Sequence, residues 1–355
     1  MADLFENPLG TRGFAFVEFT STEPDALAKL FEQMGFTAVS KHKTHDIVRY
    51  KQGRADFLLN REQTGQAGDF SGLHNGGANA MGFLVDDASQ AFKGAIKRGA
   101  EAAEDGKWTT TLPAIKGIGG SLIYLVTDAE KDAFFEAEFD AIAGVDEAAG
   151  NLGFYYIDHL THNVHRGQME HWGKFYEDIF NFRQIRYFDI EGKLTGLISK
   201  AMTSPDGNIR IPLNESRDDK SQIEEFLRDF NGEGIQHIAI ASNDLIPSVD
   251  GLIANGIELQ DTPDSYFDLI DERLPGHDEN VDELRKRRIL LDGAPTEGQG
   301  LLLQIFSKTV IGPVFFEFIQ RKGNEGFGEG NFQALFDSIE LDQIRRGVLE
   351  DEGTT

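Results

Sequence analysis

A strand, a helix and further strands recur in the same order along this chain. Two copies of the pattern have the same spacing, because the distance in sequence from Phe83 to Gly99 equals that from Ile240 to Gly256. Self-similarity of this kind indicates one supersecondary unit that occurs several times. We therefore predict four β-α-β-β-β modules, whose first strands lie at residues 13–19, 80–85, 154–160 and 235–240.

The 355 residues of the chain exceed what one hydrophobic core usually supports, so two domains are expected. Residues 141–153 are small and polar, as in linkers between domains. We predict an N-terminal domain at residues 1–150 and a C-terminal domain at residues 151–355. Each is expected to be an α+β domain built from two paired modules.

Composition narrows the classes of partner. The formal net charge of −26 at pH 7 repels nucleic-acid phosphates and anionic lipid surfaces, so neither is an expected partner. The absence of cysteine excludes disulfide bonds, thiolate metal ligands and a cysteine nucleophile. No apolar run approaches the roughly 20 residues that span a bilayer, and the first residues lack the pattern of a signal peptide. We therefore predict a cytoplasmic protein.

A carboxylate, Glu317, lies at the centre of an aromatic and β-branched run at residues 313–320 that predicts a buried strand. An ionised carboxylate in an apolar interior needs a cation or a metal as its partner. His159 and His237 lie in the first strands of the third and fourth modules, which are also apolar. Two imidazoles and a carboxylate are the ligand set of non-haem Fe(II) oxygenases, although Zn(II) also accepts these ligand types.

We therefore predict a metal site at His159, His237 and Glu317. For each histidine, a hydrogen-bonded core residue is the alternative interpretation. The repeat places Ala80 at the position of His237 and Glu18 at that of His159, so the metal site is expected in the C-terminal domain alone.

Further residues are candidates for a substrate pocket around the metal. Gln304 is a polar residue in the apolar strand 301–306 and could orient a substrate or be a hydrogen-bonded core residue. Ser199, Pro212 and Asn214 are predicted to end strands, with a polar loop at residues 214–222, and ordinary turn chemistry is their alternative role.

Two further features lie close in sequence to the strands that contain the predicted metal ligands. Phe327 and Phe332 flank a glycine-rich segment that could form a lid, although a helix cap at Asn331 is the simpler interpretation. Strand alternation puts His162 on the face opposite His159, where we expect it to be exposed or to support the ligands from behind.

Five motifs give the chain a family resemblance. They are Ile157-Asp158-His159-Leu160, Gly234-Ile235-Gln236-His237-Ile238-Ala239, Leu302-Leu303-Gln304-Ile305-Phe306, Phe315-Phe316-Glu317-Phe318-Ile319-Gln320-Arg321 and Gly326-Phe327-Gly328-Glu329-Gly330-Asn331-Phe332. In these motifs and over essentially its whole length, the chain resembles the bacterial 4-hydroxyphenylpyruvate dioxygenases of the vicinal oxygen chelate superfamily. The resemblance implies paired modules that form open, barrel-like sheets, a C-terminal gating helix and one Fe(II) per subunit, held by His159, His237 and Glu317.

The resemblance also implies a reaction, in which 4-hydroxyphenylpyruvate and O2 become homogentisate and CO2 during tyrosine and phenylalanine catabolism. The expected partners are this substrate and O2, and the expected assembly is a homo-oligomer, either a dimer or a tetramer. The family's substrate-pocket residues match Ser199, Pro212, Asn214, Gln222, Gln236, Gln304, Phe306, Phe327, Asn331 and Phe332.

Three alternatives stay open. A hydroxymandelate synthase would use the same substrate, metal and fold. A non-catalytic protein of the same fold would bind a small aromatic ligand, and an intact metal triad argues against it. A Zn or Ni isomerase of the superfamily is the third, and the gating C-terminal tail and the phenylalanine-lined pocket argue against it.

Overall fold

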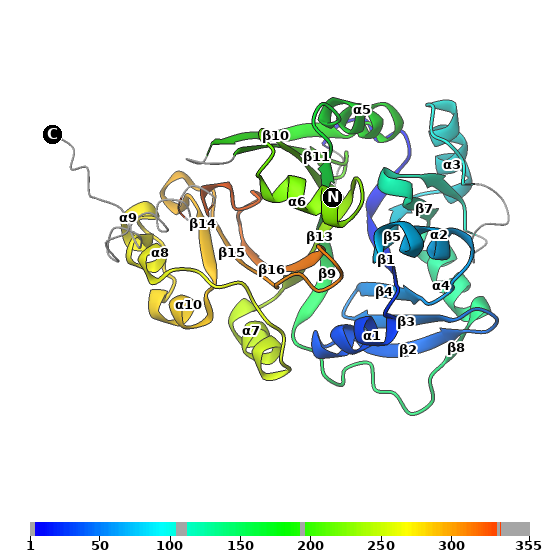
Figure 1. Ribbon diagram of the computed structural model, residues 1–355, viewed down its shortest axis with the longest axis horizontal. Coiled ribbons are helices and arrows are strands. Elements are labelled where there is room, and N and C mark those ends of the chain that lie inside the picture. The colour runs from blue at the N-terminus through cyan, green and yellow to red at the C-terminus, as the bar shows by residue number, and fades with distance from the viewer. Residues whose placement is uncertain (1–3, 104–111, 192–195, 332–333, 335–355) are drawn as a thin grey trace.

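The structure is a computed structural model, and it describes residues 4–103, 112–191, 196–331 and 334. Within these residues the strands form two mixed sheets of eight strands each, which lie side by side with helices on their outer faces (Figure 1). Strands β1 to β8 form the first sheet and strands β9 to β16 form the second. The predicted α+β architecture of paired modules is confirmed.

The first sheet has the strand order β6-β7-β5-β1-β4-β3-β2-β8. Its central strands, β1 and β5, run antiparallel, and each has a parallel neighbour on its other side, β4 and β7 respectively. The elements of this half are β1 (Thr11–Ser21), α1 (Pro24–Gln33), β2 (Thr37–His42), β3 (Ile47–Gln52), β4 (Ala55–Asn60), α2 (Gly65–His74), β5 (Gly76–Val85), α3 (Ala88–Lys97), β6 (Ala114–Lys116), η1 (Ile118–Gly120), β7 (Leu122–Val126), α4 (Asp128–Glu138) and β8 (Phe139–Ala141).

The second sheet repeats this arrangement in the order β10-β11-β12-β9-β13-β16-β15-β14, with β9 and β13 as its antiparallel centre. Its elements are β9 (Phe154–Val164), α5 (Met169–Phe180), β10 (Arg183–Glu191), β11 (Gly196–Thr203), β12 (Arg210–Ser216), α6 (Gln222–Asp229), β13 (Gly234–Ser242), α7 (Leu245–Ala254), α8 (Asp264–Asp268), α9 (Ile270–Arg273), α10 (Val281–Arg287), β14 (Leu290–Gly293), η2 (Pro295–Glu297), β15 (Leu301–Phe306) and β16 (Phe315–Lys322).

The second module departs from the predicted repeat. Only β6 and β7 follow α3 in the described part of this module, whereas three strands follow the first helix of each of the other modules. Strand β8 pairs instead with β2, at the far edge of the first sheet. The division of the chain at residue 150 stays a prediction, although the connection between the two sheets does lie at residues 142–153.

Pairing between the central strands corrects one predicted equivalence. Ala80 pairs with Glu18, whereas His237 pairs with Thr161, so Glu18 corresponds to Thr161 when the two sheets are matched. Phe16 then takes the place of His159, and the prediction that Glu18 does so is wrong by two residues. The error arises because β1 and β9 connect to their helices through segments of different length.

At the positions matched to His159, His237 and Glu317, the first sheet has Phe16, Ala80 and Tyr124, so it lacks this ligand set there. Phe16 lies against Tyr124 with a ring-centroid separation of 5.4 Å, and both are fully buried. Phe134 and Phe135 of α4 belong to the same buried cluster. The counterpart of the metal site in the first sheet is therefore a packed core.

The back of the strand that contains Glu317 rests on the first sheet. Phe316 is fully buried, and its ring centroid lies 6.0 Å from that of Phe19 and 5.9 Å from that of Phe57. Successive residues of a strand face opposite sides, so Glu317 points away from this contact. His74 adds a polar contact between the halves, because its Nδ1 lies 2.6 Å from the carbonyl oxygen of Phe230 in the second half. Its Nε2 lies 2.9 Å from the carbonyl oxygen of Gly119 in its own half.

We predict that Phe316→Ala lowers the free energy of unfolding by about 3–5 kcal/mol, because it removes a buried ring at the contact between the sheets. Urea unfolding of the metal-free chain measures this loss. Tyr187→Ala provides the control, because Tyr187 is half exposed and its loss should change stability by less than about 0.5 kcal/mol. A loss below about 1 kcal/mol for Phe316→Ala would show that the two sheets do not depend on this contact.

Candidate metal centre

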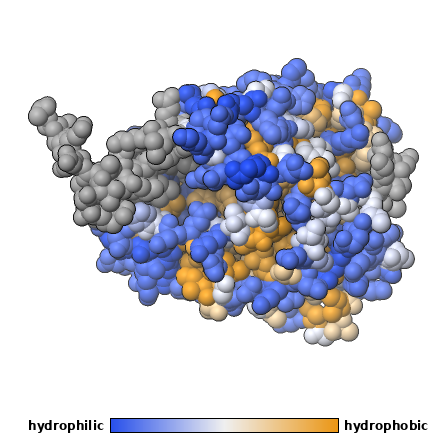
Figure 2. Space-filling model, in the orientation of Figure 1, coloured by the Kyte–Doolittle hydropathy of each residue, from blue (hydrophilic) through white to orange (hydrophobic). Residues whose placement is uncertain are grey.

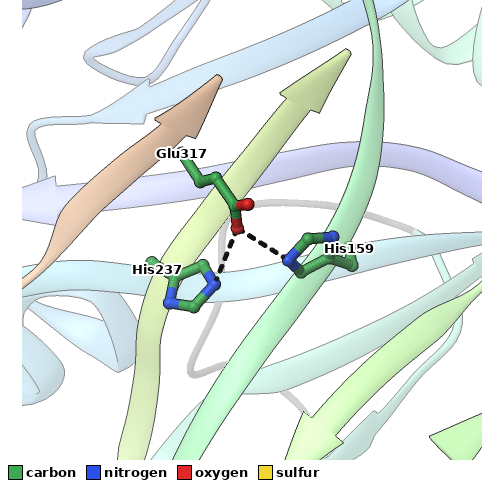
Figure 3. A group of neighbouring side chains, drawn as sticks. All are labelled: His159, His237 and Glu317. Atoms are coloured by element: carbon green, nitrogen blue, oxygen red, sulfur yellow. Dashed lines mark ion pairs between the residues drawn. The ribbon is translucent and has the colours of Figure 1, made fainter. Parts of the chain in front are cut away.

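Three neighbouring strands of the second sheet contain the predicted metal ligands. Ala239 of β13 pairs with His159 of β9 on one side and with Glu317 of β16 on the other. His237 lies two residues before Ala239, so it projects from the same face as these two neighbours. The imidazoles of His159 and His237 flank the carboxylate, and all three side chains converge (Figure 3).

The ligand atoms of the three residues are close enough to bind one ion. Glu317 Oε2 lies 3.0 Å from His159 Nε2 and 3.2 Å from His237 Nε2. One ligand atom from each residue lies within 4.8 Å of the other two, and all three residues are buried. The described residues contain this one group of three such side chains with converging ligand atoms.

Both histidines are held in the tautomer that metal binding needs. His159 Nδ1 lies 2.9 Å from Asp158 Oδ1, and His237 Nδ1 lies 2.9 Å from Gln236 Oε1. A carboxylate oxygen and an amide oxygen are acceptors, so each Nδ1 bears the proton and donates it. Each Nε2 lies beside Glu317 Oε2 and can offer its lone pair to a metal ion in place of a proton shared with that carboxylate.

Two β-bulges make these hydrogen bonds possible. Between β9 and β13 the register shifts at Asp158 and again at Gln236, so each is an extra residue in its strand. A bulge re-aims the side chain of the extra residue, which strict alternation would point away from its neighbour. The first sheet has the same two register shifts, at Ala15 and Asn79. The bulges thus belong to the module, and only the second sheet uses them to orient histidines.

The electrostatics of the group favour a bound cation. Burial alone would raise the pKa of Glu317, but His159 and His237 lower it to about 2. Burial lowers the pKa of His237, whereas the Glu317 charge and the Asp158 hydrogen bond outweigh burial at His159 and raise its pKa. Glu317 is therefore ionised in an apolar setting, and a divalent ion bound by the three side chains would neutralise it. The residues fit such a metal.

A chain of hydrogen bonds holds the other oxygen of the carboxylate. Gln304 Nε2 donates to Glu317 Oε1 at 3.2 Å, and Asn331 Nδ2 donates to Gln304 Oε1 at 3.1 Å. Tyr266 completes the chain by donating from its hydroxyl to Asn331 Oδ1 at 2.6 Å. Gln304 is thus a buried, hydrogen-bonded residue that positions the carboxylate, and its predicted role in orienting a substrate stays a prediction.

The glycine-rich segment passes directly over Gln304. A Cβ atom on Gly328 would lie 1.8 Å from Gln304 Oε1, and the φ angle of Gly328 is +79°. A side chain at this position would therefore clash and strain the backbone. Only glycine lets the segment approach the carboxylate network this closely.

A cavity opens in front of the three ligands. Phe327 and Phe306 form two of its walls, with ring centroids 5.4 Å from His159 and 6.4 Å from His237 respectively. Ser199 and Asn214 are the polar neutral side chains on the opposite strands. The full lining comprises His159, Thr161, Phe188, Leu197, Ser199, Pro212, Asn214, His237, Phe306, Glu317, Phe327 and Glu329.

Ser199, Pro212 and Asn214 lie within strands, so the prediction that they end strands is wrong. Strand β12 continues to Ser216, and Asn214 pairs with Ser199 across β11 and β12. Of the polar residues there, Asn214 lines the cavity, whereas Glu215 accepts a hydrogen bond from Met169 N at 2.9 Å and Ser216 donates one to Glu224. Pro212 is tolerated because the pairing of β12 with β9 begins at the next residue, Leu213.

The remaining predicted pocket residues lie in different settings. Gln236 contacts His237, as described above, and Asn331 is buried beside Gln304. Gln222 is exposed in the first turn of α6 and is not among the described residues that line the cavity. Phe332 and the predicted C-terminal helix lie outside the described residues.

His162 is fully buried, so the first of the two alternatives predicted for it, exposure, is wrong. Strand β9 extends to Val164, and helix α5 covers its outer face. His162 Nε2 lies 2.8 Å from the Tyr176 hydroxyl of that helix, on the side away from the ligands. Burial lowers the pKa of His162 to about 3, so the ring is neutral at pH 7.

Several residues of the site were not identified from the sequence. Thr161 follows His159 by two residues, so strand alternation could have placed it in the cavity. Its hydroxyl is buried and has no hydrogen-bond partner among the described residues. Leu197 shares a face with Ser199 for the same reason, whereas no sequence signal points to Phe188 or Glu329.

Known proteins match this chain along nearly all of its length. Residues 5–140 match the family described as hydroxyphenylpyruvate dioxygenase, N-terminal, and residues 156–269 match the glyoxalase/bleomycin resistance protein/dioxygenase superfamily. The chain is 52% identical over 350 residues to 4-hydroxyphenylpyruvate dioxygenase of Pseudomonas aeruginosa, with 97% of each chain covered. The chain belongs to the 4-hydroxyphenylpyruvate dioxygenase family.

Other relatives in this family have similar coverage. The chain is 51% identical over 346 residues to 4-hydroxyphenylpyruvate dioxygenase of Legionella pneumophila, covering 97% of this chain and 98% of the relative. It is 54% identical over 352 residues to a protein named hemolysin VllY of Vibrio vulnificus, with 97% and 98% covered.

Solved structures show the same fold as this member of the 4-hydroxyphenylpyruvate dioxygenase family. A xylose isomerase-like TIM barrel/4-hydroxyphenylpyruvate dioxygenase fusion protein matches with a TM-score of 0.81 at 26% identity, over 95% of this chain and 54% of that one. A variant of 4-hydroxymandelate synthase from Streptomyces coelicolor matches with a TM-score of 0.77 at 24% identity, over 94% and 99%. The predicted vicinal oxygen chelate fold is confirmed.

Hydrophilic residues cover much of the face shown in Figure 2. None of the helices in the described residues is long and apolar enough to cross a bilayer.

The buried neutral ring of His162 predicts an acid-dependent loss of stability. Its pKa is about 3 in the folded state and about 6.5 when unfolded, so the unfolded state binds the proton first as the pH falls. Stability should therefore decline below about pH 6.5, by up to about 1.4 kcal/mol per pH unit from this group. His162→Gln keeps a polar partner for Tyr176 and should lack this component.

Urea unfolding of both chains between pH 7 and pH 4, with a chelator present, measures the difference. The same substitution at exposed His171 is the control and should leave the pH dependence unchanged. A constant difference in stability between the wild-type chain and His162→Gln over this range would contradict the prediction.

Proposed function

We propose that this protein is an Fe(II)-dependent dioxygenase that converts 4-hydroxyphenylpyruvate and O2 to homogentisate and CO2. One observation carries the proposal. Two imidazoles and one carboxylate meet at the floor of a cavity with aromatic walls, in a chain that is 52% identical to a 4-hydroxyphenylpyruvate dioxygenase. Three protein ligands leave metal positions open for a bidentate substrate and O2.

His159, His237 and Glu317 would hold the iron. Bound Fe(II) supplies the redox chemistry through which O2 is reduced while the α-keto acid is oxidised and loses CO2. The protein keeps both imidazoles in the Nδ1–H tautomer through Asp158 and Gln236. It also fixes one carboxylate oxygen through Gln304, so the ligand set needs little reorganisation when substrate binds.

The cavity walls would orient the substrate and exclude water. Phe306 and Phe327 offer aromatic faces for the phenyl ring, and Phe332 is proposed as a further wall. Ser199 and Asn214 would hydrogen-bond polar groups of the substrate, and Pro212 would shape the wall between them. Roles for Gln222, Gln236 and Asn331 in substrate binding stay predictions, as do a cytoplasmic location and a homo-oligomeric assembly.

Hydroxymandelate synthesis is the second candidate, because a variant of 4-hydroxymandelate synthase has the same fold. That activity would use the same substrate class and the same ligand set. The position of the new hydroxyl group, on the ring or on the side chain, separates the two reactions.

We predict that the Fe(II)-loaded protein consumes O2 with 4-hydroxyphenylpyruvate and forms homogentisate. Chromatography and mass spectrometry of the product, together with an oxygen electrode, test this outcome. Hydroxymandelate as the sole product would show that the protein has the second candidate activity, hydroxymandelate synthesis. Firm iron binding without any oxygen uptake would reject both candidates and favour a protein that binds an aromatic ligand without turnover.

Glu317→Ala should weaken Fe(II) binding by more than about a hundredfold and abolish turnover. A metal ligand should matter more than the groups that support ligands, whose loss typically costs 10- to 100-fold in affinity. Competition with a chelator measures the affinity. Glu18→Gln is the matched control, since Glu18 is also a buried carboxylate within a strand but has Asn60 and Asn79 as partners. Unchanged iron affinity in Glu317→Ala would remove Glu317 from the ligand set.

A further inference from the structure

Asp158 is a fully buried carboxylate next to the metal ligand His159. Its Oδ1 accepts hydrogen bonds from His159 Nδ1 at 2.9 Å and from an Arg321 guanidinium nitrogen at 2.7 Å. Its Oδ2 accepts from Arg321 Nε at 2.8 Å, from the Tyr156 hydroxyl at 2.9 Å and from Arg210 at 3.3 Å. Only the Oδ1 side of the carboxylate touches a metal ligand.

Arg321 connects this carboxylate to the segment that lines the cavity. It lies on β16, four residues after Glu317, and its side chain is 10% exposed. Its remaining terminal nitrogen donates to the carbonyl oxygens of Asn324 at 3.0 Å and Gly326 at 2.7 Å. These residues form the turn before Phe327, whose ring contacts His159 and lines the cavity.

We propose that Asp158 and Arg321 are a pair of positioning residues that link the metal ligand His159 to the placement of Phe327. Asp158 fixes the tautomer and the ring orientation of His159 for metal binding. Arg321 holds Asp158 with two nitrogens and the turn at Asn324–Gly326 with a third. The inference deepens the proposed function, because it concerns how the same metal site is built.

The geometry distinguishes this role from that of an ordinary buried ion pair. A buried ion pair is by itself weak evidence for stability. Here Asp158 is the extra residue of a β-bulge, which turns its carboxylate toward its own neighbour in the sequence. Arg321 uses a planar fork with several donors, an arrangement that the single ammonium group of lysine does not reproduce.

The first test measures Co(II) affinity and the visible Co(II) spectrum without substrate. Asp158→Asn should weaken Co(II) binding by about 10- to 100-fold, the range for groups that support metal-ligating histidines, and should alter the spectrum. Tyr156→Phe is the matched control, because it removes a hydrogen bond to Oδ2 only. Its Co(II) affinity should stay within about twofold of the wild type, since Oδ1 and His159 are untouched.

Asp158→Asn leaves the buried Arg321 without its full counter-charge and could unfold the chain. The double variant Asp158→Asn/Arg321→Gln removes both charges, so it has no uncompensated guanidinium. It should fold, as judged by near-ultraviolet circular dichroism, and should show the same weakened Co(II) binding. Wild-type affinity and spectrum in a folded variant of either kind would overturn the role of Asp158.

The second test separates the two contacts of Arg321. Lysine can pair with Asp158 but cannot also reach both carbonyl oxygens of the turn. Arg321→Lys should therefore keep Co(II) affinity within about threefold, while the KM for 4-hydroxyphenylpyruvate rises about tenfold, equivalent to one lost charge-assisted hydrogen bond. An unchanged KM would overturn the link to Phe327.

The Co(II) readouts are independent of the proposed reaction, whereas the KM readout of the second test depends on it. The Co(II) measurements need no turnover, so a failure of homogentisate formation leaves the first test intact. Conversely, wild-type Co(II) binding in the variants would reject the positioning role even if homogentisate is formed.

Discussion

The structure around the site depends on one unfavourable arrangement, an ionised carboxylate in an apolar strand. Glu317 has a lowered pKa despite its burial, because His159 and His237 face one of its oxygens. Gln304 donates a hydrogen bond to the other oxygen. The back of its strand is anchored by Phe316 against aromatic rings of the first sheet. A metal ion bound by the converging ligand atoms would neutralise the buried charge of Glu317, and this attraction would contribute to the metal affinity.

The two sheets have the same architecture, but one face forms a metal site in the second sheet and a packed core in the first. Both have central antiparallel strands with bulges at matched positions. In the first sheet Phe16 and Tyr124 fill the face that His159 and Glu317 occupy in the second. Function therefore resides in the side chains of one face and not in the fold, as holds for widely used folds in general.

Two hydrogen-bonded paths lead from the ligands to the same stretch of chain. One runs from His159 through Asp158 and Arg321 to the turn before Phe327, and the other from Glu317 through Gln304 to Asn331. Gly328 lies between the two end points and permits the close approach. The cavity wall and the metal ligands thus share supports, so their geometries are coupled by contacts within the described residues.

The sequence by itself determined the order of strand and helix that recurs in the modules, apart from the third strand predicted for the second module, and it determined the metal ligands. Period-two alternation identifies strands, and a histidine or carboxylate inside an apolar strand requires a polar partner wherever the strand is placed. Only the tertiary structure decided the register of the central strands. The β-bulges put Asp158 and Gln236 beside the histidines, which strict alternation would forbid. His162 is buried because helix α5 packs over it. Strand β12 continues beyond Asn214 to Ser216 because it pairs with its neighbours. Strand ends, bulges and burial depend on neighbours that are distant in sequence, and local pattern does not specify those neighbours.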